Sequence, residues 1–169
     1  PDVYEGAPTS ITAFFAIVPK IAAVAIIFRF CLEPFGNFYN EWSQIIIFLS
    51  IASMFLGAIA AIAQNNLKRL LAYSSIGHVG YVLIALAAAN DEGIKAVVIY
   101  MFIYMIMNIA IFAILLSLKS SKGFVEKIDE LSGLSKSNPL IGLSLAIIMM
   151  SMAGIPPFIG FFGKFYVFI

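Results

Sequence analysis

Three ionisable residues lie inside long apolar stretches of the 169-residue sequence, where a charge is costly. Lys20 is near the middle of the run from Ile11 to Phe30, His78 lies in a later stretch, and Lys164 lies in the last one. A lysine at the centre of a membrane helix costs about 2.5–3.5 kcal/mol on insertion scales, and such residues usually serve transport. Lysine and histidine both bind and release protons, and none of these stretches contains Asp or Glu. The set therefore favours proton transfer over the binding of a metal cation.

Lys20 follows a proline, which changes the backbone next to its amine. Pro19 has no N–H, so a carbonyl about one turn earlier is expected to lose its helical partner. A free carbonyl beside a buried amine is a place for water or a proton. The alternative is that Lys20 pairs with an acid from a segment outside this chain.

His78 is the only histidine, and small polar residues surround it at helical spacing. Ser74 and Ser75 precede it by four and three residues, so all three can share one helix face, and Tyr81 is a further polar candidate on this span. Two nearby glycines keep this helix thin, so a second helix or a file of water can approach. A neutral histidine, hydrogen-bonded between packed helices, is an equally good interpretation. With one histidine and no acid nearby, we expect no metal site.

Lys164 follows a sequence that cannot continue a regular helix. Gly154 and Ile155 precede Pro156 and Pro157, which lack backbone donors and crowd the preceding turn. The pattern predicts a discontinuous membrane helix, as transporters use near the bilayer midplane, although a simple kink or two half-segments are alternatives. Lys164 lies about two turns, roughly 10 Å, beyond the break, and we expect it to reach the same polar axis as Lys20.

The composition places these residues in an all-α, polytopic membrane helix bundle. Hydrophobic residues make up 62% of the chain and charged residues 11%. We expect one membrane domain over 1–169, an internal piece of a longer protein. The net charge of +1 and the lack of a basic stripe argue against nucleic-acid binding. The single cysteine excludes a disulfide framework and a cysteine-ligated iron–sulfur cluster within the chain.

The apolar pattern predicts about five transmembrane helices. They cover residues 11–29, 43–63, 70–89, 94–118 and 139–169, the last one broken at 154–157. A polar loop over 2–8 precedes the first. In the segment 119–138, apolar residues recur at helical spacing among charges, which predicts a short amphipathic helix at the membrane interface. These residues are Phe124, Val125, Ile128, Leu131 and Leu134.

The basic residues predict the orientation of the chain. Threading five spans places six of them on the side of the N-terminal loop: Lys68, Arg69, Lys119, Lys122, Lys127 and Lys136. The other side receives only Arg29 and Lys95. By the positive-inside rule, the N-terminus faces the cytoplasm or the mitochondrial matrix.

Three stretches of the sequence resemble one family. They are Pro1–Pro8 (PDVYEGAP) with the later Pro19-Lys20, residues 68–81 (KRLLAYSSIGHVGY), and residues 153–166 (AGIPPFIGFFGKFY). Together they resemble the antiporter-like subunit N family of NADH–quinone oxidoreductase, respiratory complex I, called subunit 2 in mitochondria. The second stretch is shared by all antiporter-like subunits. The first and third select subunit N, because the related subunit M would carry a glutamate where Lys164 stands.

The resemblance implies a mechanism and partners. Lys20 matches the central lysine of a proton-carrying axis, Lys164 matches the lysine on a broken helix toward the exit, and His78 lies near the axis. NADH, FMN, iron–sulfur clusters and quinone are expected in partner subunits, and no cofactor in this chain. The other membrane subunits of complex I and the lipid bilayer are the expected partners, in a bacterial cytoplasmic or mitochondrial inner membrane. A multisubunit cation/proton antiporter and an ion-free membrane scaffold are the alternatives.

Overall fold

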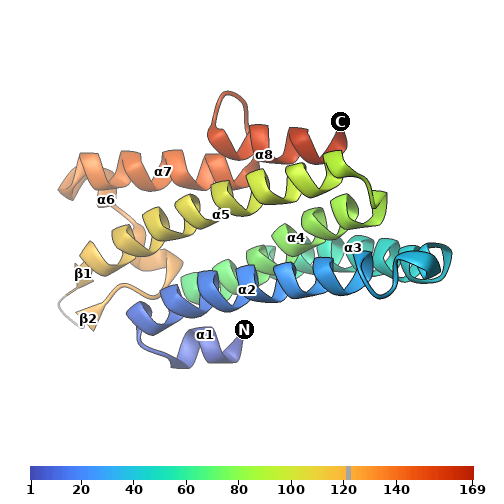
Figure 1. Ribbon diagram of the computed structural model, residues 1–169. Helices are drawn as coiled ribbons and strands as arrows, with labels where there is room; N and C mark the ends of the chain where they lie inside the picture. Colours follow the sequence, from blue (N-terminus) through green and yellow to red (C-terminus); the bar gives the residue numbers. More distant parts are fainter. Residues whose placement is uncertain (121–122) are drawn as a thin grey trace.

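Four long apolar helices lie side by side in the computed structural model, which describes residues 1–120 and 123–169 (Figure 1). They are α2 (Thr9–Leu32), α3 (Tyr39–Ile62), α4 (Leu67–Ala88) and α5 (Asp91–Ser117). Even the shortest, with 22 residues, is about 33 Å long and can cross the hydrocarbon of a bilayer. Two shorter apolar helices, α7 (Pro139–Ala153) and α8 (Ile159–Phe168), form a fifth crossing. The predicted all-α polytopic bundle is confirmed.

The four long helices begin two to four residues before the predicted spans, and in α4 and α5 a polar side chain caps the first turn. The Asn66 side chain accepts hydrogen bonds from the N–H groups of Lys68 and Arg69 at the start of α4. Asn90 does the same for Gly93 at the start of α5. Such caps satisfy donors that have no partner within the helix, so charged residues can belong to the first turn.

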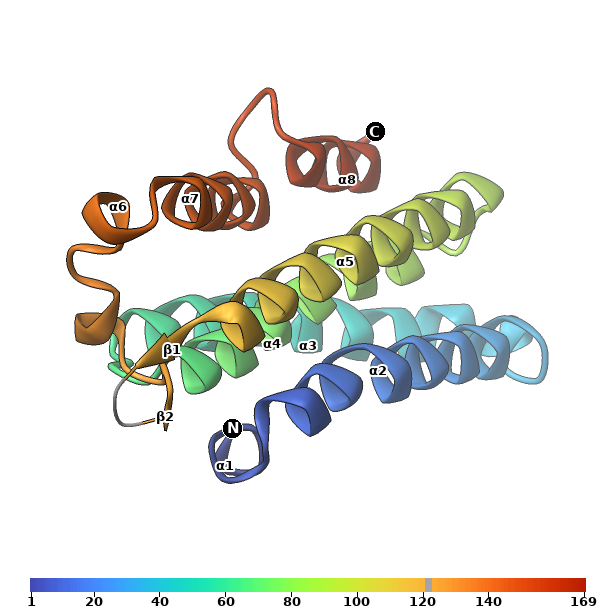
Figure 2. The same cartoon turned by 90° about the vertical axis from the view of Figure 1, so that its left-hand side faces the viewer.

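The centre of the bundle is formed by α4 and α5. In the most apolar part of each span, 56% of α4 and 50% of α5 is buried, against 17% of α2 and 11% of α3. Figure 2 shows α7 and α8 above α5, with α2 and α3 on the far side of the bundle. The polar residues of α4 and α5 are thereby enclosed by helices from both sides.

Tight packing joins α3 to α4 through glycine. A side-chain carbon added at Gly57 would lie 2.6 Å from the backbone nitrogen of Gly77. One added at Gly80 would lie 2.6 Å from the Met54 side chain. The expectation that glycine lets a second helix approach α4 closely is confirmed.

The polar segments differ from their predicted structures. Residues expected to form a loop at the start make the short helix α1 (Asp2–Gly6). In place of one amphipathic helix, the segment after α5 contains β1 (Lys119–Ser120), β2 (Gly123–Phe124), the 3₁₀ helix η2 (Ile128–Leu131) and α6 (Leu134–Ser137). Gly133, with a φ of +79°, separates the last two, because a left-handed residue ends helical continuity. A further 3₁₀ helix, η1 (Gly36–Phe38), connects α2 to α3.

The apolar residues of that segment pack on the bundle itself. Val125, Ile128, Leu131 and Leu134 contact the core cluster that contains Leu67. The Leu67 N–H also donates to the Glu126 carbonyl, and the Ile128 N–H donates to that of Asn65. The helical spacing therefore marked residues that bury against the bundle, rather than a continuous helix. Lys122 and the Phe124 side chain lie outside the described part of the chain.

The turns between the helices lie at the ends of the bundle that the predicted order of five spans assigns to them. The α1 helix, the turn between α3 and α4, and residues 118–120 and 123–138 lie at one end (Figure 1). The turns at 33–38 and 89–90 lie at the other end, with the C-terminal residue Ile169.

Candidate proton-transfer site

Lys20 extends from α2 toward the centre of the bundle, where tyrosines surround its amine. Its Nζ lies 3.4 Å from the hydroxyl oxygen of Tyr104, to which it donates a hydrogen bond. The same nitrogen lies 5.0 Å from the centroid of the Tyr4 ring and 6.0 Å from that of Tyr104. Aromatic ring faces attract a cation at these distances. Among the described residues, no carboxylate pairs with Lys20.

Pro19 does not interrupt α2, which continues as one helix through it. The carbonyl of Ala16, one turn earlier, accepts a long hydrogen bond of 3.4 Å from the Tyr104 hydroxyl. Tyr104 therefore links a carbonyl near Pro19 to the amine of Lys20.

His78 is buried in α4 and contacts two tyrosines of α5. Its Nδ1 lies 2.6 Å from the hydroxyl of Tyr100, within hydrogen-bond distance. Its ring centroid is 5.3 Å from that of Tyr104, which also contacts Lys20. Lys164 lines the same pocket as the imidazole. The histidine is thus anchored to α5 and adjacent to the groups that hold Lys20.

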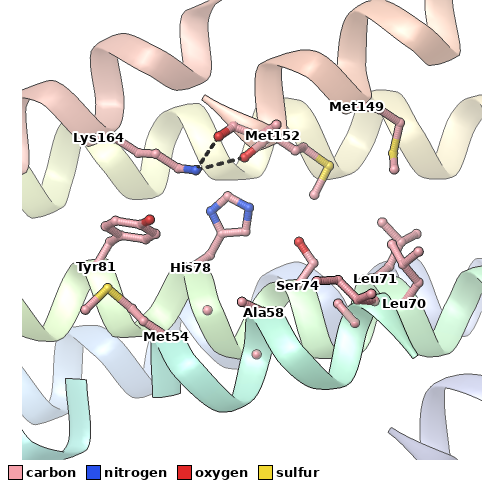
Figure 3. Close-up of a pocket in the computed structure, with 15 residues that line it drawn as sticks. Met54, Ala58, Leu70, Leu71, Ser74, His78, Tyr81, Met149, Met152 and Lys164 are labelled. Carbon is pink, nitrogen blue, oxygen red and sulfur yellow. Dashed lines mark hydrogen bonds between the residues drawn. The ribbon is translucent and has the colours of Figure 1, made fainter. Parts of the chain in front are cut away.

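The other polar residues of α4 have different surroundings. The Ser75 hydroxyl is buried and donates to the Ala72 carbonyl at 2.6 Å within its own helix. Ser74 faces the same pocket as His78, and Tyr81 lies one turn further along (Figure 3). Of the three residues predicted to share a face, Ser74 and His78 line the pocket, together with Tyr81. Ser75 does not, because it is buried with its hydroxyl bonded within α4.

The predicted break in the fifth span is present between α7 and α8. Gly154 ends α7 in the left-handed conformation, with a φ of +84°, and its N–H donates to the carbonyls of Met150 and Ser151. Pro156 and Pro157 lie in the connection, and α8 begins two residues later. The two prolines cannot supply the donors that a continuous helix needs.

The side chain of Lys164, on α8, reaches back to the end of α7. Its Nζ donates to the carbonyl oxygens of Ala153 at 2.8 Å and Met152 at 3.2 Å (Figure 3). These are carbonyls at the C-terminal end of α7, where a cation is favoured. The expected position two turns beyond the break is wrong for the amine, because the long side chain folds back to the break itself.

The start of α8 is fixed against the end of α7 at Gly160. Its N–H donates to the hydroxyl of Ser151 at 3.0 Å, and that hydroxyl lies 3.3 Å from the sulfur of Met107 on α5. A side-chain carbon at Gly160 would overlap the Ser151 carbonyl oxygen. Only glycine permits this approach, which places Lys164 within reach of the α7 carbonyls.

A pocket of roughly 350 Å³ lies between these groups. Its walls come from α3, α4, α7 and α8, and its polar groups include Ser74, His78, Tyr81 and Lys164. In Figure 3 the imidazole of His78 points across the pocket toward the amine of Lys164. That amine also lies 4.9 Å from the centroid of the Tyr81 ring. The pocket gives His78 and Lys164 a common space that a few water molecules can fill.

Sequence reasoning missed the tyrosines of this site. Tyr100 and Tyr104 are four residues apart on α5, and Asn108 follows after four more with its amide bonded to the Tyr104 carbonyl. All three are buried. Their i, i+4, i+8 spacing in an apolar helix was a signal for a polar face. Tyr4 had no such signal, because its contact with Lys20 depends on the fold of α1.

The basic pair at the start of α4 holds α1 in place. The Lys68 Nζ donates to the carbonyls of Glu5 and Ala7 at 3.2 and 3.1 Å, and pairs with Glu126 at 2.7 Å. Arg69 pairs with the Glu5 carboxylate at 3.0 Å. These contacts lie at one end of the bundle and connect two of the stretches that carry the family resemblance.

The comparisons with known proteins decide the family. The model of the NADH:quinone oxidoreductase/Mrp antiporter transmembrane family matches residues 1–169. The chain belongs to this family. Within the described residues of this family member, no cluster of three His, Cys, Asp or Glu residues could hold a metal ion.

Similar proteins of this family are named subunit N, as the predicted resemblance implies. The chain is 59% identical over 168 residues to NADH-quinone oxidoreductase subunit N of Pelagibacter ubique, covering 99% of this chain and 36% of the relative. Subunit N of Rhodospirillum rubrum is 53% identical over 169 residues, covering 100% and 35%. The chain therefore spans about a third of the length of these relatives, and its resemblance to subunit N is confirmed.

A solved structure shares the fold. A chain of the Mrp complex from Dietzia sp. superposes with a TM-score of 0.87 at 27% identity, covering 97% of this chain and 30% of that one. The chain is a multi-pass membrane protein of a family whose relatives work in multisubunit complexes.

Proposed function

We propose that the chain carries protons as part of subunit N of NADH–quinone oxidoreductase, as one membrane domain within a longer antiporter-like subunit. The observation that carries this proposal is the arrangement of two lysines about His78. Lys20 contacts Tyr104, which lies beside the imidazole, and Lys164 faces the imidazole across the pocket. Groups that exchange protons thus extend from α2 to α8 through the buried centre of the bundle.

Each group has a role in the proposed path. Lys20 takes up a proton and passes it toward His78 through the Tyr104 hydroxyl or a water molecule beside it. His78 passes it across the pocket to Lys164, whose amine is held at the break by the Met152 and Ala153 carbonyls. Ser74 and Tyr81 line the pocket and orient water there, and Pro156 and Pro157 keep the break open.

Partner subunits supply the energy in this proposal. The chain does no redox chemistry itself, and NADH oxidation and quinone reduction occur in other subunits. The neighbours are the other membrane subunits of complex I and the lipid of a bacterial cytoplasmic or mitochondrial inner membrane. The end that carries α1, Lys68 and Arg69 faces the cytoplasm or matrix, by the positive-inside rule.

A second candidate is a cation/proton antiporter subunit, which the structural similarity to the Mrp chain favours. The higher identity to subunit N argues for the first. Inverted membrane vesicles that contain the full-length subunit in its complex distinguish the two. We expect NADH with quinone to acidify the vesicle interior, and a Na⁺ gradient alone to move no protons. Na⁺-driven proton exchange without NADH would contradict the proposal.

A further inference from the structure

Tyr4 brings an aromatic ring from outside the membrane-spanning helices to the amine of Lys20. It lies on α1, yet its ring centroid is 5.0 Å from the Lys20 Nζ. The Tyr104 ring, on α5, faces the same nitrogen at 6.0 Å. An ammonium group is attracted to the face of such rings, whereas a neutral amine is not attracted in this way. The contact therefore favours the protonated, positively charged form of Lys20.

The ring of Tyr4, rather than its oxygen, makes this contact. The hydroxyl is buried near that of Ser75, but makes no hydrogen bond of ordinary geometry among the described residues. Burial raises the pKa of Tyr4 to about 12, so the phenol stays neutral at working pH. Tyr4 consequently offers Lys20 neither a negative charge nor a bonded hydroxyl, and its effect comes from the ring face.

Polar contacts at the end of the bundle hold Tyr4 in place. The Thr12 hydroxyl donates to the Tyr4 carbonyl at 3.1 Å. On the other side, Lys68 donates to the Glu5 and Ala7 carbonyls, and Arg69 pairs with Glu5. The distance from the ring to Lys20 is therefore set by a network outside the hydrocarbon.

We propose that Tyr4 is a positioning residue whose ring face helps Lys20 to keep its proton. The contacts that anchor α1 hold this ring in place. The proposal rests on the proposed role of Lys20 in proton transfer. The other groups near Lys20 are the Tyr104 hydroxyl on α5 and, beside the Tyr104 ring, His78 on α4. Lys164 on α8 lines the pocket that the same imidazole faces. Among the described residues, no carboxylate contributes to the charge balance at Lys20.

The test weakens the ring electronically while keeping its shape. In the assembled complex, Tyr4→Phe is followed by replacement with mono-, di- and trifluorophenylalanine, and NADH-driven proton uptake is measured against pH. Fluorine withdraws electron density from the ring face, so Lys20 should lose its proton at lower pH. We expect Tyr4→Phe to keep the native profile and the fluorinated series to move its alkaline limb downward stepwise, by about one pH unit in total.

The same series at Tyr166, which is exposed on α8, is the matched control and should leave the profile in place. An unchanged profile in the Tyr4 series, or an equal shift in the Tyr166 series, would overturn the proposal. The Lys20→Ala complex separates this result from the proposed function. If Lys20→Ala stops pumping while fluorination at Tyr4 has no effect, only the role of Tyr4 fails.

Discussion

Proline occurs inside two apolar segments of this chain, with opposite results for the backbone. At Pro19, α2 continues as a single helix of 24 residues. At Pro156 and Pro157, the fifth span separates into α7 and α8. One proline removes one backbone donor, and α2 tolerates this loss. Two adjacent prolines remove two donors, and Gly154 before them adopts the left-handed conformation that ends α7.

The lysine beside each proline differs accordingly. The amine of Lys164 is fixed by two backbone carbonyls that the break exposes. The helix around Lys20 remains intact, so its amine is held by one long hydrogen bond and two ring faces. Lys164 thus stabilises the backbone in addition to its proposed proton transfer, whereas the described contacts of the Lys20 amine are with side chains. The two regions should respond differently to substitution.

The largest effect is expected at Gly160, where α8 meets α7. Gly160→Ala places a carbon against the Ser151 carbonyl, so α8 must shift and carry Lys164 away from the break. We expect proton uptake to fall about tenfold or more, with less assembled complex. The control is Gly36→Ala, since an added carbon there meets nothing within 4 Å. Native activity of the Gly160→Ala complex would show that the close approach is not needed.

Two substitutions of Lys164 separate its contact with the α7 carbonyls from its proposed proton transfer. Lys164→Arg keeps a donor for the Met152 and Ala153 carbonyls but does not release its proton at accessible pH. We expect normal assembly and thermal stability, with proton uptake reduced about tenfold. Lys164→Met should lose stability as well, because the carbonyls lose their partner. Pumping at the native rate by Lys164→Arg would remove this lysine from the path.

His78 should matter less than the lysines, because the pocket beside it can hold water. His78→Ala is expected to lower NADH-driven proton uptake about threefold without abolishing it. The companion variant Tyr100→Phe removes the partner of Nδ1 and should have a smaller effect in the same assay. Complete loss of pumping in a normally assembled His78→Ala complex would rank the histidine with the lysines.

The smallest effect is expected at Pro19. Pro19→Ala returns one N–H to a helix that is already continuous, so it should change the pumping rate by less than about twofold. Pro157→Ala, measured beside it, should do more, because it restores a donor at the break. If Pro19→Ala reduced pumping as strongly as Lys164→Arg, the backbone at Pro19 would itself belong to the path.

The sequence predicted the long helices and the break because these depend on local chemistry. Apolar runs of about twenty residues cross a membrane only as helices, and the paired prolines cannot continue one. The same reasoning failed for the segment 119–138, where the apolar residues bury against the bundle end and Gly133 ends the regular structure. Helical spacing alone does not distinguish these cases.

The candidate site was predictable only in part. Lys20, His78 and Lys164 stand out because charge and imidazole are unusual in apolar runs. Tyr104 and Tyr4 contact Lys20 from positions 84 and 16 residues away in sequence, and only the packing of α5 and α1 brings them there. The direction of the Lys164 side chain was also beyond the sequence, because it depends on the approach of α8 to α7 at Gly160.

The most direct test of the account is proton uptake by inverted vesicles whose assembled complex carries Lys20→Ala, measured together with quinone-linked NADH oxidation. The described contacts of the Lys20 amine are with side chains and not with backbone carbonyls, so the complex should assemble normally. Both activities should then fall together by about tenfold or more. Native proton uptake by an assembled Lys20→Ala complex would contradict the proposal that protons pass through this lysine.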